Sequence, residues 1–230
     1  RASFFRYTFP QDRDGRLMID LHVEAEYDYH LLGVDVKRVS DHRIEGYAHQ
    51  ISPRPHVWSN DADQEYTLHF VIEFDRPIKK MGAWRDSEKI TTEHLLAENL
   101  TDAGVWVEFD TSSSAVVNTR TGISLVSIEN ASENLEKEIS APFGWDYKAV
   151  VDNQRNVWND ILSRIDIESN DNNEKVRFYT NMYRSLCRNT WSDVNGEWKS
   201  AGKKIKKFEN PDHVALGCDA FWNTFWNLNQ

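Results

Sequence analysis

The sequence predicts an antiparallel β-sandwich followed by α-helices, because the spacing of its apolar residues changes near residue 140. Before that point, short runs rich in Val, Ile, Phe and Tyr are separated by turn signals such as Asp14-Gly15, with no helical pattern between them. After Pro142, apolar residues recur at three- and four-residue steps. We therefore expect a β domain over residues 1–140 and the start of a helical domain over residues 141–230.

The strand signal is carried by runs at residues 4–9, 16–23, 66–74, 104–110 and 123–128. In the third run, strict alternation places five apolar side chains on one face: Tyr66, Leu68, Phe70, Ile72 and Phe74. Strands at this spacing, with no helix between them, favour two packed antiparallel sheets. The acidic segment 127–138 is expected to lead the chain out of the β domain.

Two amphipathic helices are predicted after this segment. The first carries apolar residues from Tyr147 to Ile165, and Asp146 is placed to cap it. The second spans Asn173 to Arg188, with residues 169–173 as its turn and cap region.

Composition narrows the classes of partner. The chain has 27 Lys and Arg against 37 Asp and Glu, a net charge of −10, which argues against nucleic acid or an anionic membrane surface as the main partner. It contains no apolar run of the roughly 20 residues that a membrane span needs. Its first residues, RASFFRYTFP, read as part of a strand rather than a signal peptide, so we expect an internal piece of a longer protein. Cys187 and Cys218 fit no zinc spacing and are expected to be small buried thiols.

No self-contained active site is indicated. The eight histidines are scattered, and none has the HExxH spacing of a metal site. The nucleophile elbow, the phosphate-binding loop and the dinucleotide fingerprint do not occur. Carboxylates are plentiful, but a general acid and base are paired in space, so the sequence selects none.

Four other stretches have alternative interpretations. Residues 53–58 combine Arg, His and Trp, which fits a sugar- or peptide-contacting loop or, more simply, a proline-stiffened connection. Residues 193–198 resemble a calcium loop in composition, but they lack its ligand ladder and favour a tight Asn-Gly turn. Residues 84–86 indicate a surface turn, and the basic run 203–207 indicates a solvated loop.

The final stretch, residues 217–230, is the richest in aromatic and amide side chains. Phe221, Phe225 and Leu228 follow helical spacing, which turns Trp222 and Asn223 toward another side. Aromatic faces edged by amides suit a sugar, because C–H surfaces stack on rings while hydroxyls bond to amides. A buried helix start, with its amides bonded to neighbouring backbone, is the alternative, and the residues alone leave both open.

Several segments, in order, resemble glycoside hydrolase family 92, the calcium-dependent exo-acting α-mannosidases. They are residues 4–10 (FFRYTFP), 16–21 (RLMIDL), 126–138 (VSIENASENLEKE), 158–168 (WNDILSRIDIE), 174–186 (EKVRFYTNMYRSL) and 219–228 (DAFWNTFWNL). The resemblance covers nearly the whole chain and is carried by the order of the segments rather than by one decisive motif.

The resemblance implies an N-terminal β-sandwich joined to a C-terminal (α/α)6 barrel, with the active site where they meet. It implies a mannose-terminated glycan as substrate, Ca²⁺ as cofactor, inversion at the sugar carbon, and a secreted or periplasmic location. The acid and base carboxylates and the calcium ligands are expected downstream of this chain, which alone should be inactive. No feature predicts the oligomeric state.

Matched by position, Trp222 and Thr224 agree with the family pattern. Asn223 stands where many members have Asp, and Trp226 where Arg is common, while nearby Asp219 offers a carboxylate. The resemblance therefore predicts Trp222, Asn223 and Asp219 as substrate contacts, and none of them as the catalytic acid or base.

Two other functions fit the same elements. One is a non-catalytic carbohydrate-binding sandwich with a helical appendage. The other is a different enzyme built from a sandwich and an (α/α)6 barrel, such as a disaccharide phosphorylase. A phosphorylase needs a basic phosphate pocket, for which this acidic chain gives no sign.

Overall fold

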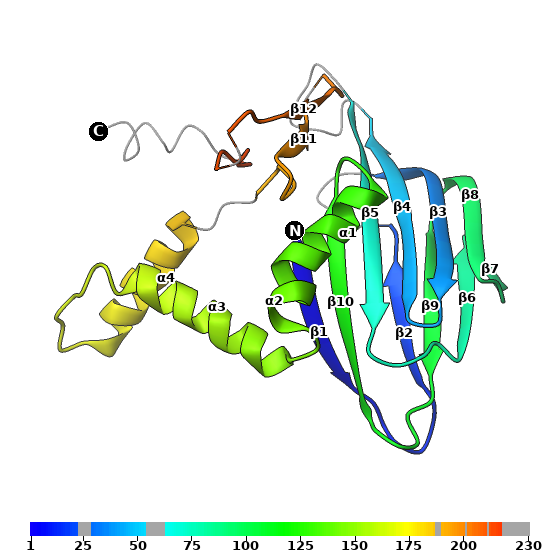
Figure 1. Ribbon diagram of the computed structural model, residues 1–230, viewed down its shortest axis with the longest axis horizontal. Helices are drawn as coiled ribbons and strands as arrows, with labels where there is room; N and C mark the ends of the chain where they lie inside the picture. Colours follow the sequence, from blue (N-terminus) through cyan, green and yellow to red (C-terminus); the bar gives the residue numbers. More distant parts are fainter. Residues whose placement is uncertain (23–28, 54–62, 187–189, 201, 211, 218–230) are drawn as a thin grey trace. The chain divides into compact units, whose positions relative to one another are not determined.

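The computed structural model describes residues 1–22, 29–53, 63–186, 190–200, 202–210 and 212–217. The chain divides into two compact units (Figure 1). The first contains residues 1–147 and, after an interval, residues 193–195; the second contains residues 148–192 and 196–230. The chain thus leaves the first unit after Tyr147 and returns to it at Asp193.

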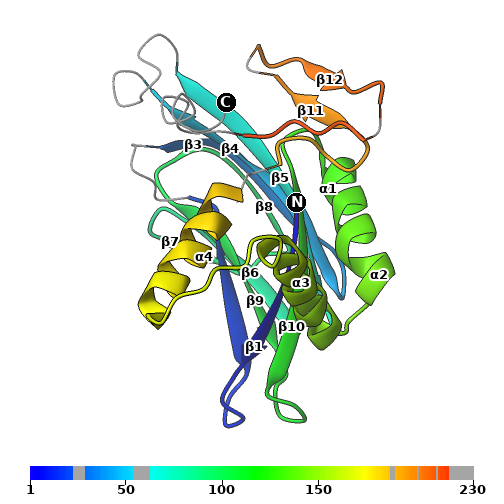
Figure 2. The ribbon, with the colours of Figure 1, turned by 90° about the vertical axis from the view of Figure 1, so that its left-hand side faces the viewer.

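The first unit is built on two antiparallel sheets. The larger has six strands in the order β1 (Ala2–Thr8), β10 (Val116–Ser124), β5 (Gln64–Phe74), β4 (Arg43–Ser52), β3 (His30–Ser40) and β8 (His94–Leu100). The smaller has four, in the order β2 (Gly15–Asp20), β9 (Ala103–Phe109), β6 (Lys80–Arg85) and β7 (Glu88–Ile90). Figure 2 shows β1 and β10 side by side at one edge of the larger sheet. The predicted sandwich followed by helices is confirmed.

The main hydrophobic core lies between the two sheets. Phe74 of β5 and Phe109 of β9 meet there with ring centroids 5.1 Å apart, and both are almost fully buried. Phe70 and Phe74 belong to this core and Ile72 packs against it, as the alternation in residues 66–74 predicts. A smaller apolar cluster covers the opposite face of the larger sheet: Val71, Ala131, Leu135 and Ile139.

The segment that follows β10 differs from the prediction. The sequence predicts a strand over residues 123–128, but β10 ends at Ser124 and helix α1 (Ile128–Leu135) begins four residues later. Ser127 ends the extended backbone, because its hydroxyl accepts a hydrogen bond from the Asn130 N–H at 3.1 Å and caps the helix. The acidic segment is thus helical, continuing through the π-helix η1 (Glu136–Ser140) into α2 (Ala141–Phe143).

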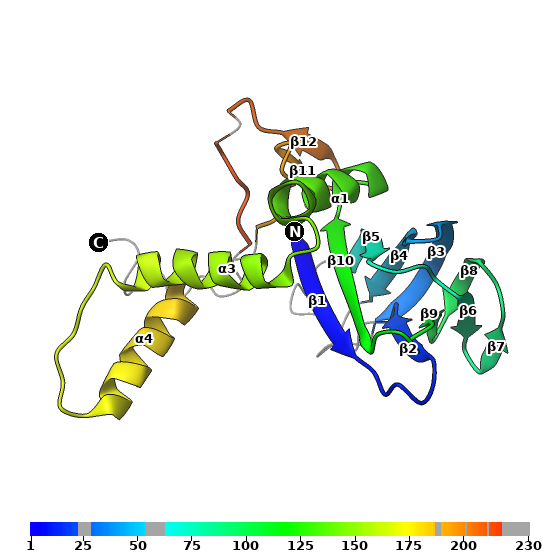
Figure 3. The same ribbon diagram turned by 60° about the horizontal axis from the view of Figure 1, so that its bottom comes forward.

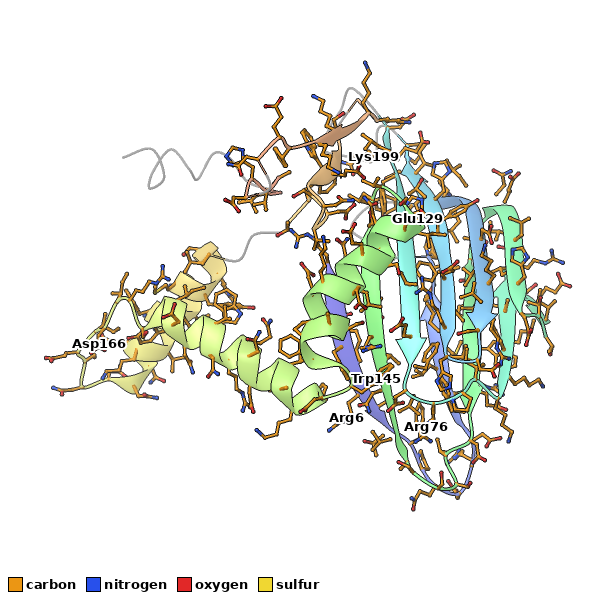
Figure 4. All side chains as sticks on the ribbon, in the orientation of Figure 1. Arg6, Arg76, Glu129, Trp145, Asp166 and Lys199 are labelled. Carbon is orange, nitrogen blue, oxygen red and sulfur yellow. The ribbon has the colours of Figure 1, made fainter. Side chains whose placement is uncertain are left out.

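Arg120 of β10 holds the end of this helical segment on the sheet. Its guanidinium lies 3.9 Å from the ring centroid of Trp145, which Figure 4 labels, and it donates to the Gly144 carbonyl oxygen at 3.0 Å. The same side chain pairs with Glu73 of β5 at 2.6 Å. A planar cation suits this position because it can stack on the indole while its two terminal nitrogens donate to two different acceptors.

The second unit begins with two helices, α3 (Tyr147–Leu162) and α4 (Asn172–Leu186), joined by a loop (Figure 3). Both predicted helices are confirmed, and Asp171 lies in the expected cap region, where its carboxylate accepts from the Asn173 N–H at 2.8 Å. The Trp158 and Tyr183 rings meet at 4.5 Å. Within the described part of the chain, no residue of α3 or α4 is fully buried, and none of the described helices is long and apolar enough to cross a membrane.

Gly122 on β10 provides a test of how closely α1 is seated. A Cβ atom there would lie 2.1 Å from the Ala131 carbonyl oxygen, so Gly122→Ala forces the helix and strand apart. We expect a loss of about 1–3 kcal/mol in unfolding free energy, measured by urea denaturation.

Gly33 on β3 is the matched control, because its nearest neighbour would be 3.9 Å from an added Cβ atom. Gly33→Ala should leave stability unchanged or slightly raised. Equal losses in the two variants would contradict the proposed close contact.

Candidate functional site

The three predicted substrate contacts, Asp219, Trp222 and Asn223, lie outside the described residues and remain predictions. Most of the 53–58 loop and both cysteines lie outside as well. The structure describes the chain up to Gly217, and therefore the segment that leads directly into residues 219–223.

Two stretches meet just before Gly217. Thr190 and Leu216 form an antiparallel bridge, and the Trp191 N–H donates to the Ala215 carbonyl oxygen at 2.7 Å. The Ala215 N–H in turn donates to the Ser192 hydroxyl at 3.1 Å. Residues 190–192 therefore fix the backbone immediately before the predicted substrate segment.

Between these stretches the chain forms a turn and a hairpin. Gly196 has a φ of +83°, a backbone conformation that favours glycine. This conformation agrees with the predicted tight Asn-Gly turn rather than with a calcium loop. The strands β11 (Glu197–Lys199) and β12 (Ile205–Lys207) then pair, closed by the Phe208 N–H donating to the Gly196 carbonyl oxygen at 3.1 Å. The basic run, predicted as a solvated loop, is exposed, but its last three residues form strand β12.

Aromatic side chains pack along the hairpin. The Trp198 and Phe208 rings are stacked at 5.8 Å, and the Lys206 ammonium lies 5.5 Å from the Trp198 centroid. The Trp191 indole N–H donates to the Lys199 carbonyl oxygen at 2.8 Å, while 47% of the surface of Trp191 stays exposed. Trp198 therefore contacts both a ring and a cation of the hairpin, and these contacts stabilise the hairpin.

Asp193, where the chain returns to the first unit, is a buried carboxylate with only 6% of its surface exposed. One oxygen accepts from the Ser124 hydroxyl at 2.7 Å and the Asn130 amide at 2.8 Å. The other accepts from the Asn134 amide at 2.7 Å. Within the described residues this carboxylate forms no ion pair, so neutral donors alone replace its lost hydration.

Asn134 extends this network to backbone. It is fully buried, its amide also donates to the Ile123 carbonyl oxygen at 2.9 Å, and its own oxygen accepts from the Val194 N–H at 2.8 Å. Hydrogen bonds to a charged group contribute about 1.5–3 kcal/mol each, and a buried partner left unpaired costs a comparable amount. The network therefore ties residues 193–194 firmly to α1 and β10.

The structure shows no self-contained catalytic or metal centre among the residues it describes. No group of three or more His, Cys, Asp and Glu side chains in that part could hold a metal ion. An open groove of about 480 Å³ lies between α3 and α4, but none of its described lining residues is a carboxylate. It thus offers no acid and base pair for hydrolysis.

The carboxyl groups with perturbed pKa values are not suited to act as proton donors. The pKa of Glu129, in the first turn of α1 (Figure 4), is lowered because its own backbone N–H and the Ser127 hydroxyl bind its carboxylate. The pKa of Asp86 is lowered because Thr101 donates to it from its hydroxyl and its backbone. A general acid needs the opposite shift. Asp86 instead supports the predicted surface turn at residues 84–86, between β6 and β7.

The Asp193 network was not predicted from the sequence. Its only local signal is the pair Asn130 and Asn134, spaced one turn apart on α1, and both are buried. Buried amides at this spacing form a polar stripe that needs partners. Nothing in the sequence identifies that partner, because Asp193 lies 59 residues after Asn134.

Family comparisons cover both parts of the chain. The model for the glycosyl hydrolase family 92 N-terminal domain matches residues 1–124. The model for the glycosyl hydrolase family 92 catalytic domain matches residues 130–230. Comparison with curated protein sequences gave no match.

Solved structures agree in fold. A family 92 inverting mannosidase from Bacteroides thetaiotaomicron has a TM-score of 0.75 and 18% identity, covering 98% of this chain and 28% of its own. An α-mannosidase of the same family and organism, in complex with mannoimidazole, has a TM-score of 0.78 and 20% identity. The match covers 98% of this chain and 28% of the mannosidase. A further family 92 glycosyl hydrolase has a TM-score of 0.75 and 21% identity, and the match covers 96% of this chain and 28% of that protein. The chain thus spans less than a third of the length of these structures.

The turn at Gly196 gives a test of how the hairpin is held. Gly196→Ala places the new methyl group in ordinary van der Waals contact with Phe208, 3.9 Å away, but imposes a left-handed backbone on alanine, which costs about 1–2 kcal/mol. We expect faster hydrogen exchange at the hairpin amides, including the Phe208 N–H that donates to Gly196.

Two variants serve as controls for this measurement. Gly196→Asn should be milder, because asparagine enters the left-handed region more readily. Gly202→Ala should leave exchange unchanged, since an added Cβ atom there meets nothing closer than 4.0 Å. Unchanged exchange in Gly196→Ala would contradict the strained-turn interpretation.

Proposed function

Because the chain belongs to glycoside hydrolase family 92, we propose that it is part of an enzyme that removes terminal α-linked mannose from glycans. The observation that carries this proposal is the ordered match of the family's N-terminal and catalytic domains across residues 1–124 and 130–230. The likeness to an α-mannosidase in complex with mannoimidazole supports mannose as the sugar.

The proposed reaction is a single displacement with inversion. One carboxylic acid protonates the leaving oxygen, while a carboxylate on the opposite ring face activates water, and the two are about 6.5–9.5 Å apart. The described residues present no such pair in a cleft, and the chain spans 28% of the mannosidase structures. We therefore assign the acid and base to other parts of the complete protein, which would form an (α/α)6 barrel around them.

Calcium is the proposed cofactor. A hard cation with oxygen ligands suits the vicinal hydroxyls of mannose. The described residues do not form a site for it, so its ligands are also proposed to come from other parts of the complete protein. Secretion or export to the periplasm is proposed from the family resemblance.

Trp222, Asn223 and Asp219 are proposed to contact the sugar, with Trp222 stacking on the ring and the other two bonding to hydroxyls. We propose that the sandwich ends near residue 140 and that the helical catalytic domain begins at residue 141. The catalytic-domain match at residues 130–230 favours an enzyme over a non-catalytic binding module.

The complete protein is expected to release mannose from an α-mannoside and to lose activity with EDTA. Nuclear magnetic resonance of the fresh product should show the β-anomer first, because displacement by water from the opposite face inverts the configuration. Added Ca²⁺ should restore activity, and the isolated 230-residue chain should be inactive. An α-anomer formed first, or turnover that EDTA leaves unchanged, would contradict the mechanism.

Truncation of Trp222 tests the proposed stacking. In the complete protein, Trp222→Ala should raise KM for the mannoside by roughly ten-fold, equivalent to about 1.4 kcal/mol of binding. Trp222→Phe keeps an aromatic face and should retain most of the affinity. Equal KM values in the wild type and the alanine variant would contradict the proposal that Trp222 contacts the sugar.

A further inference from the structure

Two tryptophans lie across glycines on the outer face of the smaller sheet, which Figure 3 shows on the side of the sandwich away from α1. Trp84 of β6 is paired with Gly104 of β9, and Trp106 of β9 is paired with Gly82 of β6. A Cβ atom on Gly104 would lie 2.2 Å from the Trp84 ring, and one on Gly82 would lie 2.2 Å from the Trp106 ring. Each indole therefore covers the glycine opposite, in the space that a side chain would fill.

The two rings differ in what else contacts them. The Arg16 guanidinium lies 4.6 Å from the Trp106 ring centroid, and the Lys80 ammonium lies 5.7 Å from it. Trp84 is half-buried, and no cation or aromatic ring of the described residues lies over it. The Trp84 indole therefore retains surface on which a ligand can stack.

The orientation of the Trp84 ring is fixed at its polar end. Its indole N–H donates to a carboxylate oxygen of Asp102 at 3.0 Å. Asp102 is held in turn by Asp86, which accepts from the Asp102 backbone N–H at 3.2 Å. Asp86 is itself bound by the Thr101 hydroxyl at 2.7 Å. Because the ring is already held in place, binding on it costs little side-chain freedom.

Two exposed carboxylates flank this ring. Asp102 accepts from the indole with one oxygen. Asp20 pairs with Gly104 on the side opposite Trp84, and one of its oxygens accepts from a backbone N–H at 2.9 Å. Among the residues that the structure describes, the second oxygen of each carboxylate forms no hydrogen bond. These two oxygens can accept from the hydroxyls of a neutral sugar, whereas they would repel an anionic ligand.

The rest of this face does not favour a protein partner. Across the four strands of the smaller sheet, Met18 is the only large apolar residue that is exposed, with 68% of its surface accessible. Exposed charged residues surround the two rings: Arg16, Asp20, Lys80 and Lys89. Protein interfaces are depleted of charge at their centre, so this surface suits a ligand that stacks on one ring and bonds at its edges.

We propose that Trp84, Asp102 and Asp20 form a sugar-binding site on the outer face of the smaller sheet. One pyranose ring stacks its C–H surface on the indole, and its hydroxyls donate to the two carboxylates. The sugar is a mannose unit of an α-mannan, and this choice rests on the proposed function. Binding there raises the effective concentration of glycan chains at the enzyme.

Affinity electrophoresis of the complete protein, in gels that contain soluble α-mannan, tests the site. Trp84→Ala should weaken the affinity by roughly five- to ten-fold, because the stacking surface is lost. Trp84→Phe keeps an aromatic face and should retain part of the affinity. Every other mannan-binding surface of the enzyme is the same in these variants, so the difference reports on residue 84. Equal retardation of the wild type and Trp84→Ala would overturn the proposal.

Trp106→Ala is the matched control. It removes the same kind of tryptophan–glycine pair from the same two strands, so the stability of the sheet should fall to a similar degree. Because Arg16 and Lys80 already lie over the Trp106 ring, its loss should leave the affinity for α-mannan unchanged. If Trp106→Ala weakens binding as much as Trp84→Ala does, damage to the sheet explains both effects and the proposal is contradicted.

A nuclear magnetic resonance titration of the unsubstituted complete protein avoids any effect of a variant on folding. An α-linked mannose oligosaccharide should shift the indole N–H resonance of Trp84, which is bonded to Asp102, and leave that of Trp106 in place. A β-linked glucose oligosaccharide should shift neither. The titration needs no hydrolysis, so it can succeed even if the protein does not cleave mannosides. A Trp84 shift with the glucose oligosaccharide alone would contradict the choice of mannose, and no shift with either would overturn the site.

Discussion

The closeness of α1 to strand β10 is the constraint on which the rest of the structure depends. At Gly122 the strand has no side chain, which lets the backbone of Ala131 approach within a distance that any Cβ atom would block. Leu135 and Ala131 then close a small apolar cluster over Val71. With its apolar side seated in this way, α1 places the buried amides of Asn130 and Asn134 where Asp193 meets them.

The strands and the long helices were predictable because their signals are local. Alternation over residues 66–74 identified Phe70, Ile72 and Phe74, which belong to the core or pack against it, although Tyr66 and Leu68 do not. The three- and four-residue spacing identified α3 and α4. The error at residues 123–128 is also informative. The apolar residues of this segment alone predict a strand. The Ser127 side chain instead caps helix α1, which covers the sheet rather than extending it.

The buried carboxylate could not be predicted, because burial of a charge is decided by donors distant in sequence. Ser124, Asn130 and Asn134 precede Asp193 by 69, 63 and 59 residues. In the sequence, Asp193 belongs to an apparent calcium or turn motif, and its local context describes only the turn at Gly196. The predicted sugar contacts came instead from a family resemblance, which identifies a segment without describing the contacts that orient it.

The return of the chain to the sandwich at Asp193 also sets an order of assembly during synthesis. All three donors leave the ribosome before the carboxylate that they bind, and the sheet and helix that carry them are complete by then. N-terminal domains generally fold first as a chain is made. The sandwich thus presents its three hydrogen-bond donors before Asp193 is synthesised. Once Asp193 binds to them, residues 148–192, which contain α3 and α4, form a loop that is closed at both ends. The residues after Asn195 are therefore synthesised only after every part of the sandwich that binds Asp193.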